Sequence, residues 1–106
     1  MSGAGDILPE GLPALAHATW RAYLAMRDSK QAHFGFLETL EQKYQHGGIR
    51  TLAEKARLDT LLADHNRTVA EFAGEIKSLG ASDLAARDKL LGLMTAIEEA
   101  ANKVAQ

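Results

Sequence analysis

The sequence predicts an all-α protein, an antiparallel up-down-up three-helix bundle built from a long helical hairpin and a third helix. Apolar residues recur at steps of three, four and seven over long stretches, which is the period of an α-helix. Glycine and proline gather at the start of the chain, near residue 47 and near residue 80, and so divide it into three helical segments. The connections are short, so neighbouring helices are expected to run antiparallel.

One stripe on the predicted second helix organises the bundle, and we expect the whole stripe to face inward. It is apolar except for His65, and a polar residue in such a stripe commonly fixes register and oligomeric state. We therefore expect His65 to be partly buried and hydrogen-bonded to a carbonyl or carboxylate, with metal binding and pH sensing as alternatives. The stripe consists of Leu58, Leu62, His65, Val69, Phe72, Ile76 and Leu79.

Composition limits the class of protein. With 106 residues, 46% of them hydrophobic and 25% charged, the chain is large enough for one modest core. It has no cysteine, which excludes disulfides and thiolate chemistry. The net charge is −2 and the charges are interleaved, so no nucleic-acid arm is evident. No apolar run approaches the ~20 residues that span a bilayer, and we expect a cytoplasmic protein with no membrane partner.

The first helix follows a short leader. Residues 1–11 are rich in glycine and are expected to be flexible, whereas residues 12–106 form a single helical domain. A helix is predicted over 13–45, because proline suits its first turn and glycines follow its end. Polar residues 27–31 interrupt its apolar pattern, either as a solvated turn of a continuous helix or as a kink.

Two further helices complete the prediction. Thr51 and Glu54 match a capping box, in which the hydroxyl and the carboxylate each satisfy a backbone amide of the other residue. This begins a helix over 52–79, which Gly80 is expected to end. The third helix is predicted over 83–104 and carries a narrower apolar stripe.

The short turns also predict the register. Residues of the first two helices should pair when their numbers sum to about 97, which places His33 level with His65. Helices two and three should pair at sums of about 162, which brings Glu98 to the same level. Imidazole and carboxylate ligands suit zinc or iron, so these residues are an alternative metal site, with Asp64 as a further carboxylate. The Glu-x-x-His repeats of di-iron bundles are absent, and we expect no cofactor.

DNA binding is another alternative. The segment Ile49–Asp59 resembles the first helix and turn of a helix-turn-helix motif, although Arg57 stands where those motifs usually have a glycine. This resemblance implies a DNA-binding regulator, which Asp59 and Asp64 would oppose. Its phosphate contacts would be Arg50, Lys55, Arg57 and Arg67.

The sequence favours a protein without catalytic activity. No serine lies in a nucleophile elbow and no phosphate loop is present. The first helix is longer and more broadly apolar than one three-helix core requires, so we predict a protein–protein interaction or assembly module: an adaptor, chaperone-like binder or structural subunit. Its partner is a second copy, in a homodimer, or another protein. The interface candidates are Trp20, Tyr23, Phe34 and Phe36, with the small residues Ala63, Ala70 and Gly74.

Overall fold

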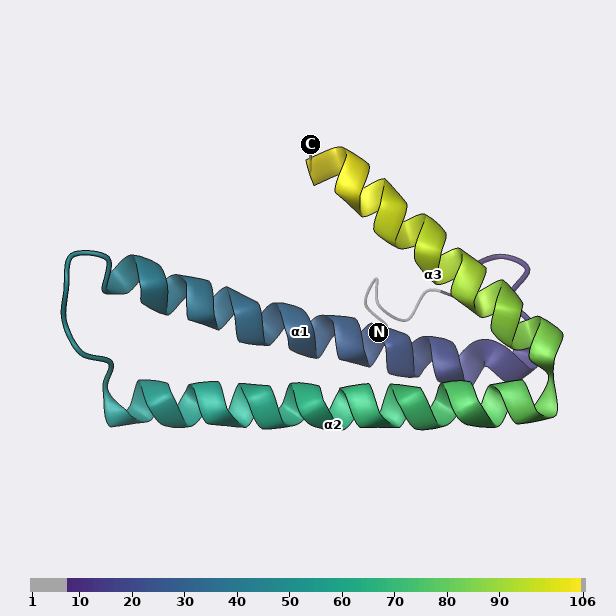
Figure 1. Cartoon of the computed structure of the whole chain (residues 1–106), viewed down its shortest axis with the longest axis horizontal. Helices are drawn as coiled ribbons and strands as arrows, with labels where there is room; N and C mark the ends of the chain where they lie inside the picture. The colour runs from purple at the N-terminus through teal and green to yellow at the C-terminus, as the bar shows by residue number, and fades with distance from the viewer. Residues whose placement is uncertain (1–7, 106) are drawn as a thin grey trace. The chain divides into compact units, whose positions relative to one another are not determined.

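The computed structural model describes residues 8–105, and these are helical without any strand (Figure 1). The 3₁₀ turn η2 (Ala14–Ala16) leads into α1 (His17–Lys43), and α2 (Leu52–Ser82) and α3 (Leu84–Ala105) follow. The three helices pack against one another, which confirms the all-α prediction. The leader predicted as flexible lies mostly outside the described residues.

The helix boundaries differ from the prediction in one instructive place. α1 is continuous through residues 27–31, but α2 does not end before Gly80. The Asp83 N–H still donates to the Leu79 carbonyl at 2.7 Å, so the hydrogen-bond pattern of α2 carries past the glycine. Glycine inside a helix costs only about 1 kcal/mol. The chain leaves the helix at Asp83, whose carboxylate accepts from the Ala86 N–H at 3.1 Å and caps α3.

The contacts divide the chain into two compact units. The hairpin unit is Ala22–Phe72, and the terminal unit comprises the described residues up to Arg21 together with those from Ala73 onward. In the terminal unit α3 contacts η2, and the Thr19 hydroxyl donates to the Glu75 carbonyl at 3.5 Å. Buried apolar side chains of this unit are Leu12, Ala16, Trp20, Leu79, Ala86 and Leu90.

In the hairpin unit α1 and α2 run antiparallel in the predicted register. Ser29 Oγ lies 2.7 Å from Thr68 Oγ1, and Lys43 Nζ lies 2.7 Å from Glu54 Oε2. The residue numbers of each pair sum to about 97, the value expected from the short connection. The register of this hairpin is therefore confirmed, while the level predicted for Glu98 involves the terminal unit and stays a prediction.

α1 covers only part of the apolar stripe of α2. Within the hairpin unit Leu58, His65 and Phe72 are half-buried, whereas Leu62 and Val69 remain 44% and 41% exposed. The expectation that the whole stripe faces inward is wrong for these two side chains. The reason is the hydrogen bond between Ser29 and Thr68, which turns the face of α2 that carries Thr68 toward α1.

The loop between α1 and α2 depends on two glycines (Figure 1). Gly47 and Gly48 have φ angles of 104° and 115°, in the left-handed region that favours glycine. A Cβ atom on Gly48 would also lie 2.9 Å from Cδ1 of Tyr44. Both the backbone and the ring therefore require glycine at position 48.

We expect Gly48→Ala to lower the free energy of unfolding by about 1–2 kcal/mol, because alanine is strained at this φ. The matched control is Gly35→Ala, where no atom lies within 4 Å of the new Cβ. At this mid-helix position the alanine should instead raise the free energy of unfolding by as much as about 1 kcal/mol. Urea denaturation followed by circular dichroism measures both, and equal effects of the two substitutions would contradict the account of the loop.

Candidate functional site

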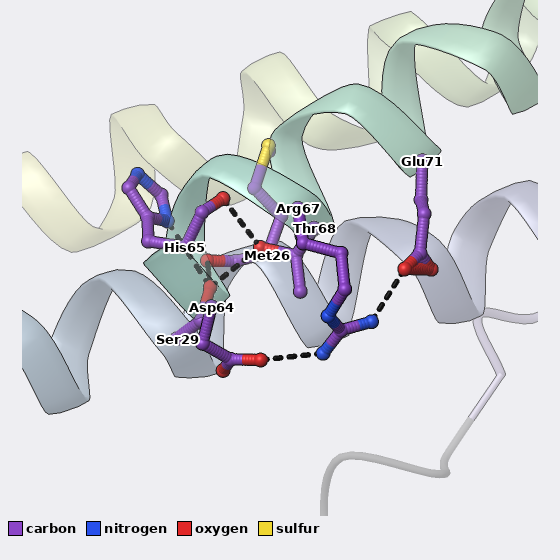
Figure 2. A network of polar contacts seen from close by, with 7 residues as sticks. All are labelled: Met26, Ser29, Asp64, His65, Arg67, Thr68 and Glu71. Atoms are coloured by element: carbon purple, nitrogen blue, oxygen red, sulfur yellow. Dashed lines mark hydrogen bonds and ion pairs between the residues drawn. The ribbon is translucent and has the colours of Figure 1, made fainter. Parts of the chain in front are cut away.

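Two hydroxyl groups and an imidazole form a polar cluster between the helices of the hairpin unit (Figure 2). Ser29 Oγ lies 2.7 Å from Thr68 Oγ1 and 3.1 Å from His65 Nδ1. It is also 2.9 Å from the Met26 carbonyl, and Thr68 Oγ1 is 2.9 Å from the His65 carbonyl. Ser29 and Thr68 are only 6% and 4% exposed, so these hydroxyls depend on one another for hydrogen bonds.

The helical backbone explains why these hydroxyls are tolerated. Each of them lies near the carbonyl three residues earlier in its own helix, Met26 for Ser29 and His65 for Thr68. Serine and threonine commonly bond to such carbonyls, which satisfies the hydroxyl locally. Each oxygen keeps lone pairs for a contact across the hairpin.

His65 joins the cluster through its Nδ1 atom, which lies 3.1 Å from Ser29 Oγ. The donor of this contact is the imidazole in one tautomer and the serine hydroxyl in the other. His65 is half-buried, as expected, but its partner in this contact is a hydroxyl rather than the expected carbonyl or carboxylate.

This arrangement differs from that of a catalytic Ser–His pair. A nucleophilic serine gives its proton to a basic imidazole nitrogen. Here the Ser29 hydroxyl also lies within hydrogen-bond distance of the Met26 carbonyl and of Thr68 Oγ1, and it is only 6% exposed, so it is not presented to a substrate. The cluster as it stands holds the two helices in register, and the prediction that the chain is not an enzyme stays a prediction.

An ion-pair group lies on the next turns of α2 (Figure 2). Arg67 donates to the carboxylates of Asp64 and Glu71. Hydrogen bonds to Asp64 and then Glu71 raise the pKa of the Arg67 guanidinium. All three side chains are exposed to about half or more, so the pairs contribute little to stability. The charge of Arg67 is nevertheless offset by two neighbours.

A further polar group lies at the tip of the hairpin. We call its residues the tip cluster: Lys43, Tyr44, Thr51 and Glu54. Glu54 Oε1 accepts from the Thr51 N–H at 2.8 Å and from the Tyr44 hydroxyl at 2.5 Å. Glu54 Oε2 accepts from Lys43 Nζ at 2.7 Å. The Glu54 N–H donates to Thr51 Oγ1 at 3.0 Å, which confirms the predicted capping box.

The tip cluster changes the acidity of its members. Hydrogen bonds from Lys43, then Tyr44, then the Thr51 backbone lower the pKa of Glu54 from 4.5 to about 2. The same carboxylate raises the pKa of Lys43 and of the Tyr44 hydroxyl, in both cases chiefly through the hydrogen bond. A single anion therefore joins the end of α1 to the start of α2.

The aromatic interface candidates fall into two groups. Trp20 and Tyr23 are 4% and 2% exposed and belong to the interior of the chain. Phe36 is half-buried, with the Arg57 guanidinium carbon 5.9 Å from its ring centroid. Phe34 is 52% exposed, the most accessible of the four. Their role in an interface stays a prediction, and Phe34 is the member that a partner reaches without rearrangement of the chain.

The small residues, and the predicted DNA contacts other than Arg50, lie on the accessible surface of α2. Ala63, Ala70 and Gly74 are exposed, and no atom lies within 4 Å of a Cβ built on Gly74. α2 continues through residue 57 without a turn, so the segment resembling a helix-turn-helix begins one long helix instead. Lys55 and Arg57 are exposed and Arg50 is half-buried. DNA binding stays a prediction.

Two of the predicted metal ligands, His33 and His65, have other neighbours within the hairpin unit. His33 is half-buried, and its ring meets the edge of Phe34 with centroids 5.2 Å apart. His65 turns Nδ1 to Ser29, and Glu98 belongs to the terminal unit. Over residues 8–105, no three His, Asp or Glu side chains gather as a metal site. Binding of a metal at His33 and His65 stays a prediction.

Sequence reasoning missed Ser29 and Thr68. Ser29 stands in the polar interruption of α1 and there looks solvated, and Thr68 lies beside the apolar stripe rather than in it. A signal was nevertheless present, because the two numbers sum to the predicted register value of about 97. A pair of hydroxyl residues at matching levels of two antiparallel helices is a candidate for a buried hydrogen bond.

We expect Ser29→Ala and Thr68→Val each to lower the free energy of unfolding by about 1 kcal/mol, because each removes the hydrogen bond between the two buried side chains. The double variant should cost less than the sum of the single ones, since it removes both hydroxyls together. Thr95→Val is the control, as this exposed hydroxyl bonds only the Leu91 carbonyl within its helix. Additivity within about 0.5 kcal/mol would contradict the pairing of Ser29 and Thr68.

The tip cluster predicts a specific pH dependence. Because folding lowers the pKa of Glu54 to about 2, its stabilising effect is complete above about pH 5 and is lost as the pH falls toward 2. We therefore expect the melting temperature of Glu54→Gln to lie below that of the wild type at neutral pH, with the difference closing near pH 2. Glu41→Gln, at an exposed position of α1, is the control. A difference for Glu54→Gln that persists unchanged to pH 2 would contradict the assignment.

Comparison with protein-family models, curated proteins and solved structures finds no match to this chain. Among the described helices, none has the length and apolar character needed to cross a bilayer. The function is therefore argued from the contacts of the chain and from the side chains that it leaves exposed.

Proposed function

We propose that the protein is a helical protein–protein interaction module that self-associates through the exposed edge of the α2 stripe. In this proposal the hairpin unit supplies the interface, and the partner is a second copy of the chain. The observation that carries it is the pair Leu62 and Val69, which are 44% and 41% exposed although they continue an apolar stripe.

Helix geometry supports an extended contact rather than isolated apolar side chains. Leu58, Leu62 and Val69 follow one another at steps of four and seven, so they lie on one line along α2. Leu58 is already half-buried, and a helix laid along this line covers the remaining apolar area. Each Å² removed from water stabilises the complex by roughly 25 cal/mol before the cost of association.

The stripe also suits a two-fold axis. In an isologous dimer, residue i of one copy contacts residue j of the other, and residue j of the first copy contacts residue i of the second. In an antiparallel pair of α2 helices centred between Leu62 and Val69, Leu62 of each copy lies beside Val69 of the other copy. On α1, Phe34 adds an exposed aromatic side chain of the kind that contributes strongly to interfaces.

The exposed alanines offer a competing face for the same association. Ala63 and Ala70 lie seven residues apart on α2 and are exposed, and small side chains let a second helix approach closely. They are separated from Leu62 and Val69 by about 100° around the helix, so the two faces are tested by different substitutions.

Size-exclusion chromatography with light scattering tests the proposal. The wild type should have the mass of a dimer, and Leu62→Gln with Val69→Gln should weaken the dimer about tenfold or more, because two apolar contacts are lost. Helicity should be unchanged, since both side chains are exposed in the single chain. The matched variant Ala63→Gln with Ala70→Gln should remain dimeric.

Two outcomes would overturn the proposal in different ways. A wild-type mass of one chain at all accessible concentrations excludes self-association. Dissociation by the alanine pair alone moves the interface to the other face of α2 and removes Leu62 and Val69 from it.

A further inference from the structure

At the tip of the hairpin the apolar side chains are more exposed than Leu62 and Val69 on the side of α2. Ile49, in the loop, and Leu52, at the first position of α2, are each 84% exposed. Large apolar side chains exposed elsewhere in the chain range from 37% to 62%. Water thus surrounds two aliphatic side chains that stand three residues apart at one end of the hairpin (Figure 1).

The tip is also held in one conformation. The tip cluster ties both ends of the loop to the Glu54 carboxylate, and the left-handed Gly47 and Gly48 make the turn between them. The loop presents Ile49 and Leu52 without the ordering cost that a flexible loop would bring to binding.

The charge of the tip is opposite to that of the rest of the chain. Residues 43–57 hold four Lys or Arg side chains and one carboxylate, a net charge of +3. Because the whole chain carries −2, the remaining residues carry −5. Glu54 is engaged by Lys43, whereas Arg50 and Lys55 have no ion pair among the described residues.

We propose that the hairpin tip docks on the surface of an anionic phospholipid bilayer, with Ile49 and Leu52 inserted between headgroups and Arg50 and Lys55 beside the phosphates. Aliphatic side chains inserted at the headgroup boundary and flanked by cations are the chemistry of peripheral membrane binding. The net charge of +3 over residues 43–57 is complementary to anionic headgroups, and Ile49 and Leu52 lie among these cations in the sequence. An acidic protein is the alternative occupant, which the experiment below distinguishes.

This proposal is independent of self-association and does not require a membrane-spanning helix. It departs from the expectation of no membrane partner, which rests on the absence of a long apolar run in the sequence. The contribution of each tip cation should be screened by salt, because the tip and the lipid headgroups interact through water.

Co-sedimentation of the full chain with vesicles tests the proposal. The wild type should bind phosphatidylcholine vesicles containing about one-third phosphatidylglycerol and should bind pure phosphatidylcholine weakly, with added NaCl releasing it. Ile49→Ser with Leu52→Ser should lower the affinity about tenfold or more. The matched control is Leu84→Ser with Leu91→Ser, at exposed positions of α3, which should bind as the wild type does.

A second pair of variants tests the charges. Arg50→Gln with Lys55→Gln should lower the affinity for the anionic vesicles about fivefold per charge removed. Lys30→Gln with Lys77→Gln removes the same charge from exposed positions outside the tip and should have a smaller effect. Circular dichroism of all four variants should match the wild type, because none of the replaced side chains is buried.

Three results would overturn the proposal. The first is absence of wild-type binding to the anionic vesicles at low salt. The second is equal loss of binding in the tip variants and their controls, which would indicate attraction without a defined site. The third is binding to soluble polyglutamate but not to vesicles, which would assign the tip to an acidic protein.

Discussion

The hydrogen bond between Ser29 and Thr68 determines how the hairpin is assembled. Two buried hydroxyls 2.7 Å apart oppose sliding of either helix by a residue, because a shift would break the hydrogen bond that joins the helices. It also sets the rotation of α2 about its own axis. With Thr68 turned to α1, the edge of the stripe that carries Leu62 and Val69 is left outside. The exposure of this edge is thus a consequence of a polar contact.

The two polar groups of the hairpin unit stabilise it in different ways. The contact between Ser29 and Thr68 joins two buried hydroxyls, so its contribution comes from a hydrogen bond that water does not reach. The tip cluster is an exposed charge network in which one carboxylate accepts from three residues. The contact between Ser29 and Thr68 fixes the middle of the hairpin, and with it the orientation of Leu62 and Val69. The tip cluster fixes the end of the hairpin, and with it the orientation of Ile49 and Leu52.

Much of this architecture followed from local rules. Thr51 and Glu54 identified the start of α2, since a capping box needs only the right residues at the right spacing. The short loop then determined the register. The rest depended on contacts that periodicity does not contain. Periodicity predicts which side chains share a face of a helix. It does not predict how much of that face a neighbouring helix covers, so the exposure of Leu62 and Val69 does not follow from the sequence. Ser29 was read as solvated because its buried partner is 39 residues away in the chain.

The closeness of the two hydroxyls has a consequence for the size of side chain that the hairpin accepts at its middle. Ser29 Oγ lies 2.7 Å from Thr68 Oγ1 and 3.1 Å from His65 Nδ1, so the space around position 29 is filled from the opposite helix. A bulkier side chain at this position would have to push α2 away from α1. The middle of the hairpin therefore restricts position 29 to small residues, whether they are polar or not.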